Sequence, residues 1–223
     1  MQILIYTRGL KIIDNVVNEE DKIMSEKLQT DFTEKIIASE SMFEGRVFDV
    51  RVAEVELIDG SESLREIVDH NGGACVVALD SDQTIYFVEQ YRISVDEAIL
   101  EIPAGKIEVG EKHLICAQRE LKEEIGITAK RWELLTKFYP TPGYCSEVIH
   151  VFLARDLTYG RPNLDPGEFL RVKEYKLDQA LKMVINNQIK DSKTMLGILL
   201  TVQKIREEVL AESVEPGDDA YGE

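Results

Sequence analysis

The stretch from Gly105 to Ile127 carries the clearest hydrophobic pattern in the chain. In its second half, apolar residues recur at spacings of three and four positions, which places them along one face of a helix. This apolar stripe consists of Leu114, Ala117, Leu121 and Ile125. Gly126 follows directly, and glycine often ends a helix because it adopts positive φ without strain. The pattern predicts an amphipathic helix that ends at Gly126.

Alternating apolar and polar positions predict strands on either side of this helix. Between Thr33 and Leu57 the alternation fits one long strand or two. Asp59-Gly60 is typical of a hairpin turn, and Leu64–Val68 is the return strand. After a break at Gly72-Gly73, further strands are expected over residues 74–79, 84–91, 98–102, 132–139, 148–154 and 170–175.

The C-terminal part predicts a loop and two helices. Residues 156–168 contain two glycines and two prolines, which favours a long loop. Helices are expected over 179–187 and from Asp191 or Ser192 to about Ala211. Strands, one helix, further strands and two helices together predict an α/β (α+β) fold arranged as a sandwich.

Composition narrows the classes of function. With 223 residues, 44% of them hydrophobic and 30% charged, the chain has the composition of a soluble globular protein. Its net charge of −16 and pI near 4.7 argue against a nucleic-acid binder, which needs a basic face. A polyanionic substrate would need a metal ion and local Arg or Lys side chains.

Cysteine usage and hydropathy predict a cytoplasmic protein without a membrane partner. The three cysteines have no metal-ligand spacing, which favours reduced thiols in the cytoplasm. No apolar run approaches the ~20 residues of a membrane span. The N-terminus lacks the charged start and long apolar core of a signal peptide.

Glu120, Glu123 and Glu124 lie off the apolar stripe of the predicted helix. Spacings of three and four positions bring side chains to ~5–6 Å of one another. Carboxylates at that distance repel each other, and one is driven toward protonation. A hard divalent cation such as Mg²⁺ or Mn²⁺ removes the conflict. The alternative interpretation is a solvated acidic helix face, against which the flanking residues argue.

The residues around the three glutamates form a longer motif. In order, it comprises Gly105, Glu111, Arg119-Glu120-Leu121, Glu123-Glu124 and Gly126-Ile127. This motif resembles the Nudix box, with nine residue types fixed over 23 positions and every defining position filled. The chain as a whole resembles the Nudix hydrolases over roughly residues 38–205. The resemblance implies a Nudix-type α/β/α sandwich with a mixed sheet.

Three further segments resemble the bacterial ADP-ribose pyrophosphatase branch of that family. They are Glu101–Gly105 and Glu89–Arg92 before the box, and Tyr139–Tyr144 after it. Pro142 lies sixteen positions after Gly126, where these enzymes carry a proline that marks ADP-ribose as substrate. The resemblance implies hydrolysis of the pyrophosphate bond of ADP-ribose to AMP and ribose 5-phosphate.

Two alternatives remain at this point. One is a Nudix hydrolase of another nucleoside diphosphate derivative, such as an ADP-sugar or a diadenosine polyphosphate. The other is a non-catalytic domain that senses ADP-ribose. The products of the reaction separate the first from the main hypothesis, and the absence of turnover would indicate the second.

The resemblance implies a metal site that binds Mg²⁺, with Mn²⁺ as the alternative ion. Glu120 and Glu124 are the first candidate ligands, followed by Glu123 and the backbone carbonyl of Ala104. Glu111 is either a ligand or an anchor between loop and helix. Arg119 is expected to orient the carboxylates through charge-assisted hydrogen bonds, and the alternative for it is an exposed ion pair with Glu123.

The general base is expected on a loop after the box, where related ADP-ribose enzymes carry a glutamate. Glu168 is the best match, with Asp165 and Glu147 as further candidates, and the alternative is an ordinary exposed glutamate. For substrate binding, Arg65 and Arg92 are candidates near the phosphates or the adenine, and Glu101 is a candidate polar contact. The alternative for each arginine is an ion pair at the sheet edge. Pro142 and Tyr144 complete the predicted substrate site.

Four segments are expected. Residues 1–37 form an N-terminal extension, and 1–23 is interpreted as a leader because Met24 resembles a second start. Residues 38–72 form a β subdomain, and 73–211 form the Nudix hydrolase domain. Residues 212–223 form a disordered acidic tail. The resemblance also implies a homodimer whose N-terminal antiparallel strands are exchanged between subunits.

Overall fold

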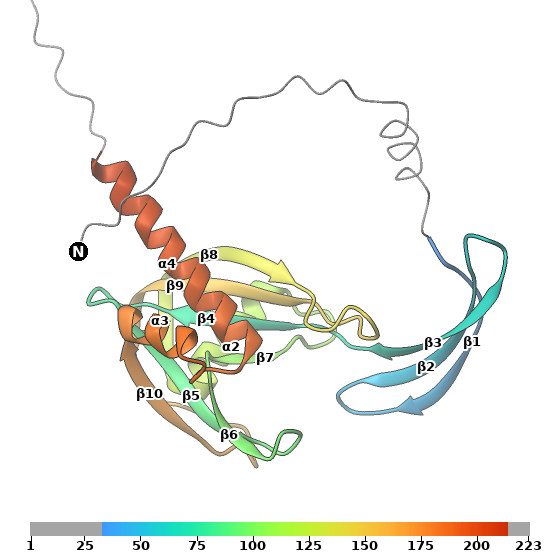
Figure 1. Ribbon diagram of the computed structural model, residues 1–223. Helices are drawn as coiled ribbons and strands as arrows, with labels where there is room; N and C mark the ends of the chain where they lie inside the picture. Colours follow the sequence, from blue (N-terminus) through green and yellow to red (C-terminus); the bar gives the residue numbers. More distant parts are fainter. Residues whose placement is uncertain (1–32, 214–223) are drawn as a thin grey trace, which may run out of the picture. The chain divides into compact units, whose positions relative to one another are not determined.

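The computed structural model describes residues 33–213 (Figure 1). These residues divide into two compact units, one comprising 33–39 and 53–64 and the other 40–52 and 65–213. The segment before Met24 and most of the acidic tail lie outside the described residues, so the predictions for them are untested. The predicted domain boundaries likewise remain predictions.

The N-terminal alternation corresponds to two strands rather than one. β1 (Lys35–Glu44), β2 (Asp49–Glu56) and β3 (Glu62–Asp69) form a three-stranded sheet in that order. The turn at Asp59-Gly60 is the predicted hairpin. Gly60 has a φ of 79°, and its N–H donates to the Leu57 carbonyl at 2.9 Å.

The larger unit contains two further sheets. Their strands are β4 (Gly73–Ala78), β5 (Thr84–Arg92), β6 (Glu97–Glu101), β7 (Ala104–Lys106), β8 (Ile127–Phe138), β9 (Ile149–Tyr159) and β10 (Leu170–Lys176). One sheet has the order β10-β5-β6 and the other the order β7-β4-β9-β8. β4 pairs with β9 in parallel, whereas β4–β7 and β8–β9 are antiparallel, so the four-stranded sheet is mixed.

The three helices are α2 (His113–Ile125), α3 (Leu177–Ile185) and α4 (Ser192–Ser213). As predicted, α2 ends at Gly126, whose φ of 72° lies in the left-handed region. α4 begins as predicted too, because the Asp191 carboxylate accepts a hydrogen bond from the Thr194 N–H at 3.0 Å. Such a cap satisfies an N–H that has no partner within the helix.

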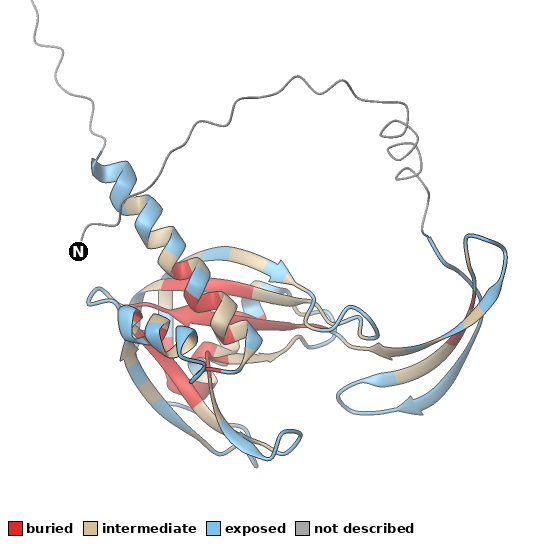
Figure 2. Ribbon diagram, in the orientation of Figure 1, coloured by how far each residue is buried: buried red, intermediate tan, exposed pale blue. Residues whose placement is uncertain are grey.

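Strand alternation places the helices on opposite faces of the sheet. On β4, Ala74, Val76 and Ala78 pack in a core with α2, whereas Cys75 and Val77 pack in a second core with α3 and α4. Figure 2 shows the buried strands between these helices, and Figure 1 shows α4 lying across β4 and β9. The predicted α/β/α sandwich with a mixed sheet is therefore confirmed.

Two strands are longer than the sequence predicts. β8 begins at Ile127, directly after the helix, rather than at Trp132, and β9 continues to Tyr159. The predicted loop over 156–168 is shorter for this reason. The alternation of apolar and polar residues is weak at the ends of these two strands. The strands extend there because they pair with each other along their whole length. Among residues 33–213, no helix is both long and apolar enough to cross a membrane.

Candidate active site

Glu120 approaches the backbone of β7 closely at Gly105. A Cβ atom on Gly105 would lie 1.7 Å from Glu120 Oε1, far inside any real contact distance. The helix carries Leu121 and Ala117 into the core on its other side. Burial of that face fixes the rotation of α2, and Gly105 leaves the space into which Glu120 then points.

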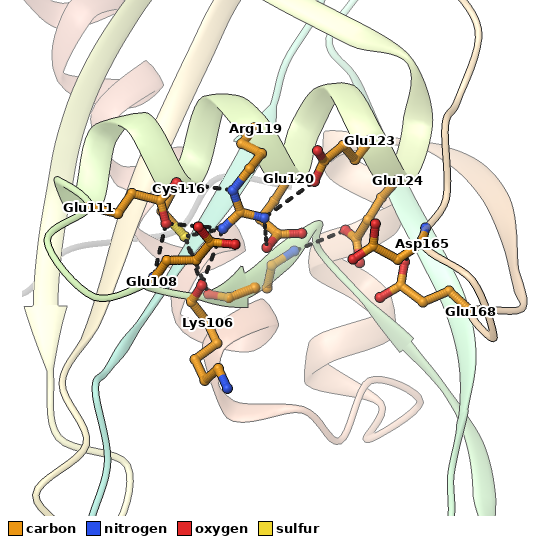
Figure 3. Close-up of polar contacts among 12 residues, drawn as sticks. Lys106, Glu108, Glu111, Cys116, Arg119, Glu120, Glu123, Glu124, Asp165 and Glu168 are labelled. Carbon is orange, nitrogen blue, oxygen red and sulfur yellow. Dashed lines mark hydrogen bonds and ion pairs between the residues drawn. The ribbon is translucent and has the colours of Figure 1, made fainter. Parts of the chain in front are cut away.

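Arg119 joins three of the predicted carboxylates (Figure 3). Its guanidinium donates two hydrogen bonds to Glu111, both at 3.0 Å, one to Glu120 at 2.6 Å and one to Glu123 at 3.2 Å. It also donates to the Lys106 carbonyl at 3.2 Å. Glu111 holds the pKa of Arg119 above its usual range through these hydrogen bonds, and Arg119 in turn lowers the pKa of Glu111. Arg119 therefore contacts three of the predicted carboxylates, and its orienting role stays a prediction.

Glu124 lies deeper than the other carboxylates. It is 4% exposed, and one of its oxygens accepts a hydrogen bond from the Ala104 N–H at 3.0 Å. Burial and the neighbouring charge of Glu120 raise its pKa to about 8. Burial also raises the pKa of Glu120, although Arg119 opposes this shift. Two adjacent carboxylates that resist ionisation are groups that a cation would stabilise.

The loop between β9 and β10 brings Glu168 to this end of α2. Asp165 and Glu168 lie beside Glu124 in Figure 3, and the charge of Glu168 contributes to the raised pKa of both Glu120 and Glu124. The Glu168 carboxylate accepts a hydrogen bond from the Asp165 N–H at 3.3 Å. The residue predicted as general base thus lies close to the predicted metal ligands.

The chemistry of these groups fits a divalent cation. Carboxylate oxygens are the ligands of hard ions, and Gly105 leaves the backbone at β7 open toward Glu120. Within residues 33–213, no cluster of three or more His, Cys, Asp or Glu side chains has the arrangement of a formed metal site. Glu111, Glu120 and Glu123 instead converge on Arg119. Binding of a cation would require Glu120 and Glu124 to turn toward the ion.

A cavity of about 390 Å³ lies beside Ala104 and Gly105. Arg92, Lys106 and Lys193 contribute cations to its lining. Arg92 donates to the Glu101 carboxylate from Nε at 2.6 Å and from Nη2 at 2.9 Å. Glu101 is 1% exposed, so its place is behind Arg92 rather than at the cavity surface. Lys193 was missed by the sequence analysis, because no local motif surrounds it.

The other predicted substrate residues lie further out. Pro142 and Tyr144 are exposed and do not line the cavity. Among the described residues of their loop, Pro140 and Glu147 do. Arg65 is half-buried on β3. Glu147 lines the cavity, and its Oε1 lies 3.4 Å from His70 Nδ1, which accepts a hydrogen bond from the Gly72 N–H at 3.0 Å.

A larger groove of about 600 Å³ borders the outer face of α2. Lys122, Trp132 and Arg161 line it, together with parts of Arg119 and Glu123. Within the described part of the chain, neither Glu120 nor Glu124 lines the groove or the smaller cavity. Ala104 and Gly105, which Glu124 and Glu120 contact, line the smaller cavity and not the groove. The smaller cavity beside Ala104 is therefore the better candidate for the active site.

The comparisons with known proteins agree with this geometry. The model of the NUDIX domain matches residues 69–196. The chain belongs to the Nudix family. Members of this family generally use divalent metal ions, in agreement with the donor set of α2.

Similar proteins include two from Bacillus species. The chain is 44% identical over 167 residues to the ADP-ribose pyrophosphatase of Bacillus subtilis (strain 168), covering 74% of this chain and 90% of that protein. It is 41% identical over 169 residues to the methanol dehydrogenase activator of Bacillus methanolicus, covering 75% and 91%. A solved structure titled "Crystal structure of ADP compounds hydrolase" superposes with a TM-score of 0.70 at 21% identity, covering 79% of this chain and 96% of that one. This last likeness concerns the fold.

Proposed function

We propose that this Nudix protein hydrolyses the pyrophosphate bond of ADP-ribose, giving AMP and ribose 5-phosphate in a reaction that requires Mg²⁺. The observation that carries the proposal is that Glu168 lies close enough to Glu120 and Glu124 to raise the pKa of both. Glu124 and Glu120 contact Ala104 and Gly105, which line a cavity with three cations. A diphosphate ester needs charge neutralisation and a positioned water. The similarity to a Bacillus subtilis protein named ADP-ribose pyrophosphatase supports this choice of substrate.

Glu120 and Glu124 would hold the Mg²⁺, with Glu123, Glu111 and the Ala104 carbonyl as further ligands; Mn²⁺ is the alternative ion. A divalent ion held by these residues would supply charge for the phosphoryl oxygens and would lower the pKa of a bound water. Its binding requires Glu124 to lose the proton that burial favours. Arg119 keeps Glu111 and Glu120 in place through the hydrogen bonds described above.

Glu168 would accept the proton of the attacking water. Its side chain lies beside Glu124 in Figure 3, and its charge raises the pKa of Glu120 and Glu124, which supports this role. Asp165, whose N–H donates to the Glu168 carboxylate, would hold the loop in shape. Arg92, fixed by Glu101, would bind the diphosphate, while Arg65, Pro142 and Tyr144 would contact the nucleoside.

We also infer a homodimer that exchanges its N-terminal strands. Large apolar side chains on β1 and after it are exposed in the single chain, including Ile36 at 51% and Phe43 at 54%. Exposed apolar surface of this kind is typical of a protein interface. The reduced cysteines Cys75, Cys116 and Cys145 support a cytoplasmic location.

A substrate panel tests the reaction. Purified protein with Mg²⁺ is given ADP-ribose, ADP-glucose, a diadenosine polyphosphate and NADH, and the products are separated by chromatography. We expect fast cleavage of ADP-ribose to AMP and ribose 5-phosphate, lost in Glu124→Gln. Preferential cleavage of another compound would replace the substrate, and tight binding of ADP-ribose without cleavage would indicate a sensor.

A second variant tests the general base. Glu168→Gln keeps the size of the side chain but removes its basicity, so turnover should fall about 10²- to 10⁴-fold. Mg²⁺ affinity, measured by calorimetry, should change little. Asp165→Asn serves as the matched control on the same loop and should retain most activity. A mild effect of Glu168→Gln would exclude Glu168 from proton transfer.

A further inference from the structure

The first turn of α4 reaches the active-site cavity although it is distant in sequence. Asp191, Ser192 and Lys193 line the same cavity as Arg92 and Ala104. The Lys193 side chain is only 12% exposed, which is unusual for a lysine on a helix. A buried lysine must be paired, and its partners show what it holds in place.

Lys193 is linked to Arg92 through a shared carboxylate. Its Nζ pairs with Glu101 Oε2 and, at 3.0 Å, with Asp191 Oδ1. The same Glu101 carboxylate accepts two hydrogen bonds from Arg92. Since a guanidinium has five N–H donors, Arg92 keeps three for the cavity. Lys193 and Asp191 thus fix the carboxylate that sets the direction of Arg92.

Thr194 holds the backbone that leads to Ala104. Its Oγ1 accepts a hydrogen bond from the Ile102 N–H at 2.8 Å and donates to Asp191 Oδ2 at 2.5 Å. Thr194 and Ile102 are both fully buried. Two residues further on, the Ala104 N–H donates to Glu124. The position of the Ala104 backbone therefore depends on the first turn of α4.

The next turn of α4 confirms how closely the helix approaches this segment. A Cβ atom on Gly197 would lie 2.8 Å from Val77 Cγ2 and 3.1 Å from Ile102 Cδ1. The helix can come this near only because residue 197 has no side chain. Contact between α4 and the end of β6 is thus fixed by packing as well as by hydrogen bonds.

We propose that the first turn of α4 is a positioning element of the active site. Lys193 acts through Glu101 on the direction of Arg92, and Thr194 acts through Ile102 on the segment that carries Ala104. The choice of ADP-ribose as substrate in the kinetic tests rests on the proposed function. The contacts of Lys193 and Thr194 are independent of that choice. Neither side chain needs to touch the substrate, because each is already engaged by buried partners.

Lys193→Met tests the first arm, with Lys190→Met as the matched control. Lys190 lies three positions earlier and pairs at 2.8 Å with Glu97, where both side chains are about half exposed. We expect Lys193→Met to raise KM for ADP-ribose about tenfold and to leave kcat within about twofold of the wild-type value. This is the result for a residue that affects binding of the ground state and the transition state equally. Lys190→Met should change neither constant. Equal KM values in both variants would overturn this arm.

Thr194→Val and Thr194→Ser test the second arm. Valine keeps the volume of threonine but leaves the Ile102 N–H without an acceptor, so kcat should fall about tenfold through displacement of Ala104 from Glu124. Serine keeps the hydroxyl and should restore kcat to within about twofold. If serine is as impaired as valine, the methyl packing matters instead, and the positioning role of the hydroxyl is refuted.

A measurement independent of turnover separates this inference from the proposed function. The Arg92 Nε–H gives a nitrogen-15 resonance that is assigned by its loss in Arg92→Lys. In Lys193→Met this resonance should shift and exchange with solvent several-fold faster, and in Lys190→Met it should not change. If the wild-type protein cleaves no ADP-ribose, the proposed substrate fails, and an unchanged Arg92 resonance in Lys193→Met would separately refute the positioning role.

Discussion

Glu124 combines burial with neighbouring carboxylates, and both raise its pKa. At the scale of single residues, this shift couples three properties that are usually studied apart: protonation, metal affinity and stability. The shift follows from the surroundings of the carboxyl and not from its place in the motif. Glu123, one position earlier, is more exposed and pairs with Arg119.

Metal affinity should depend on pH because Mg²⁺ must displace a proton from Glu124. With a pKa of about 8, the apparent affinity should rise about tenfold per pH unit between pH 6 and 8 and level off above that range. Isothermal titration calorimetry at each pH measures this slope. Glu124→Gln should remove the slope along with most of the affinity, and a pH-independent affinity of the wild-type protein would contradict the prediction.

The same group makes the metal-free protein less stable as pH rises. Its pKa is raised from 4.5 to about 8 on folding, so the native state holds a proton that the unfolded state releases. The stabilisation is complete below about pH 4.5 and is lost as pH rises through 8. Denaturant titrations from pH 6 to 9 should show this decline in the free energy of unfolding. The decline should be smaller in Glu124→Gln and smaller in the presence of saturating Mg²⁺.

Arg119 is the second residue whose role depends on its partners. In Arg119→Met, Glu111, Glu120 and Glu123 lose their common donor and repel one another. Turnover should fall about 10- to 100-fold, the usual effect of removing a group that orients metal ligands. Arg131→Met is the control, because Arg131 is 64% exposed and lies 4.0 Å from Asp156. Equal activity of the two variants would contradict an orienting role.

At the scale of elements, the site depends on how closely α2 approaches β7. The apolar stripe of α2 could be predicted from sequence, as could the glutamates beside it, because a helix repeats every 3.6 residues. The strand against which the helix packs could not be predicted in the same way. β7 is only three residues long and pairs with β4 through Gly105 and its neighbours.

Gly105→Ala tests this approach. The added Cβ would lie 1.7 Å from Glu120 Oε1, and the nearby Cδ and Cγ would also clash, so Glu120 must move or α2 must shift. We expect turnover to fall at least about 10²-fold, in line with the cost of misplacing a group at the reaction centre by ~1 Å. Gly143→Ala, whose Cβ meets nothing within 4 Å, is the control for stability. Full activity of Gly105→Ala would contradict the close approach.

At the scale of the whole molecule, a net charge of −16 contrasts with the cations around the cavity. Arg92 and Lys193 share the buried carboxylate of Glu101, so part of their charge is balanced locally and their directions are fixed. The anionic surface disfavours general binding of polyanions, so the proposed nucleoside diphosphate would bind only where the proposed metal and Arg92 neutralise its charge.

The exposed apolar residues of β1 predict the oligomeric state. Phe43 lies 6.1 Å from Phe48, ring to ring, and both are exposed in the single chain. We expect light scattering to give twice the mass of one chain. Phe43→Asp should shift the protein to a monomer, because a buried unpaired charge is costly at an interface, while Lys182→Asp on the exposed face of α3 should not. A wild-type monomer would contradict the inferred dimer.

The sequence by itself determined the family motif, the catalytic helix and most strands. These features depend on local spacing: the carboxylates of α2 and the glycine that ends it lie within 23 positions. Glu168 could also be nominated from sequence, although its distance from α2 along the chain left its place in space open.

Only the tertiary structure decided which of these groups meet. Glu124 differs from Glu123 because one is buried and the other pairs with Arg119. Lys193 and Thr194 reach Glu101 and Ile102 across 92 positions of sequence. Contacts over such separations depend on how the helices pack on the sheet, and no spacing in the chain encodes them. The sequence therefore specified the candidate groups, and the packing of α2 and α4 decided their partners and their burial.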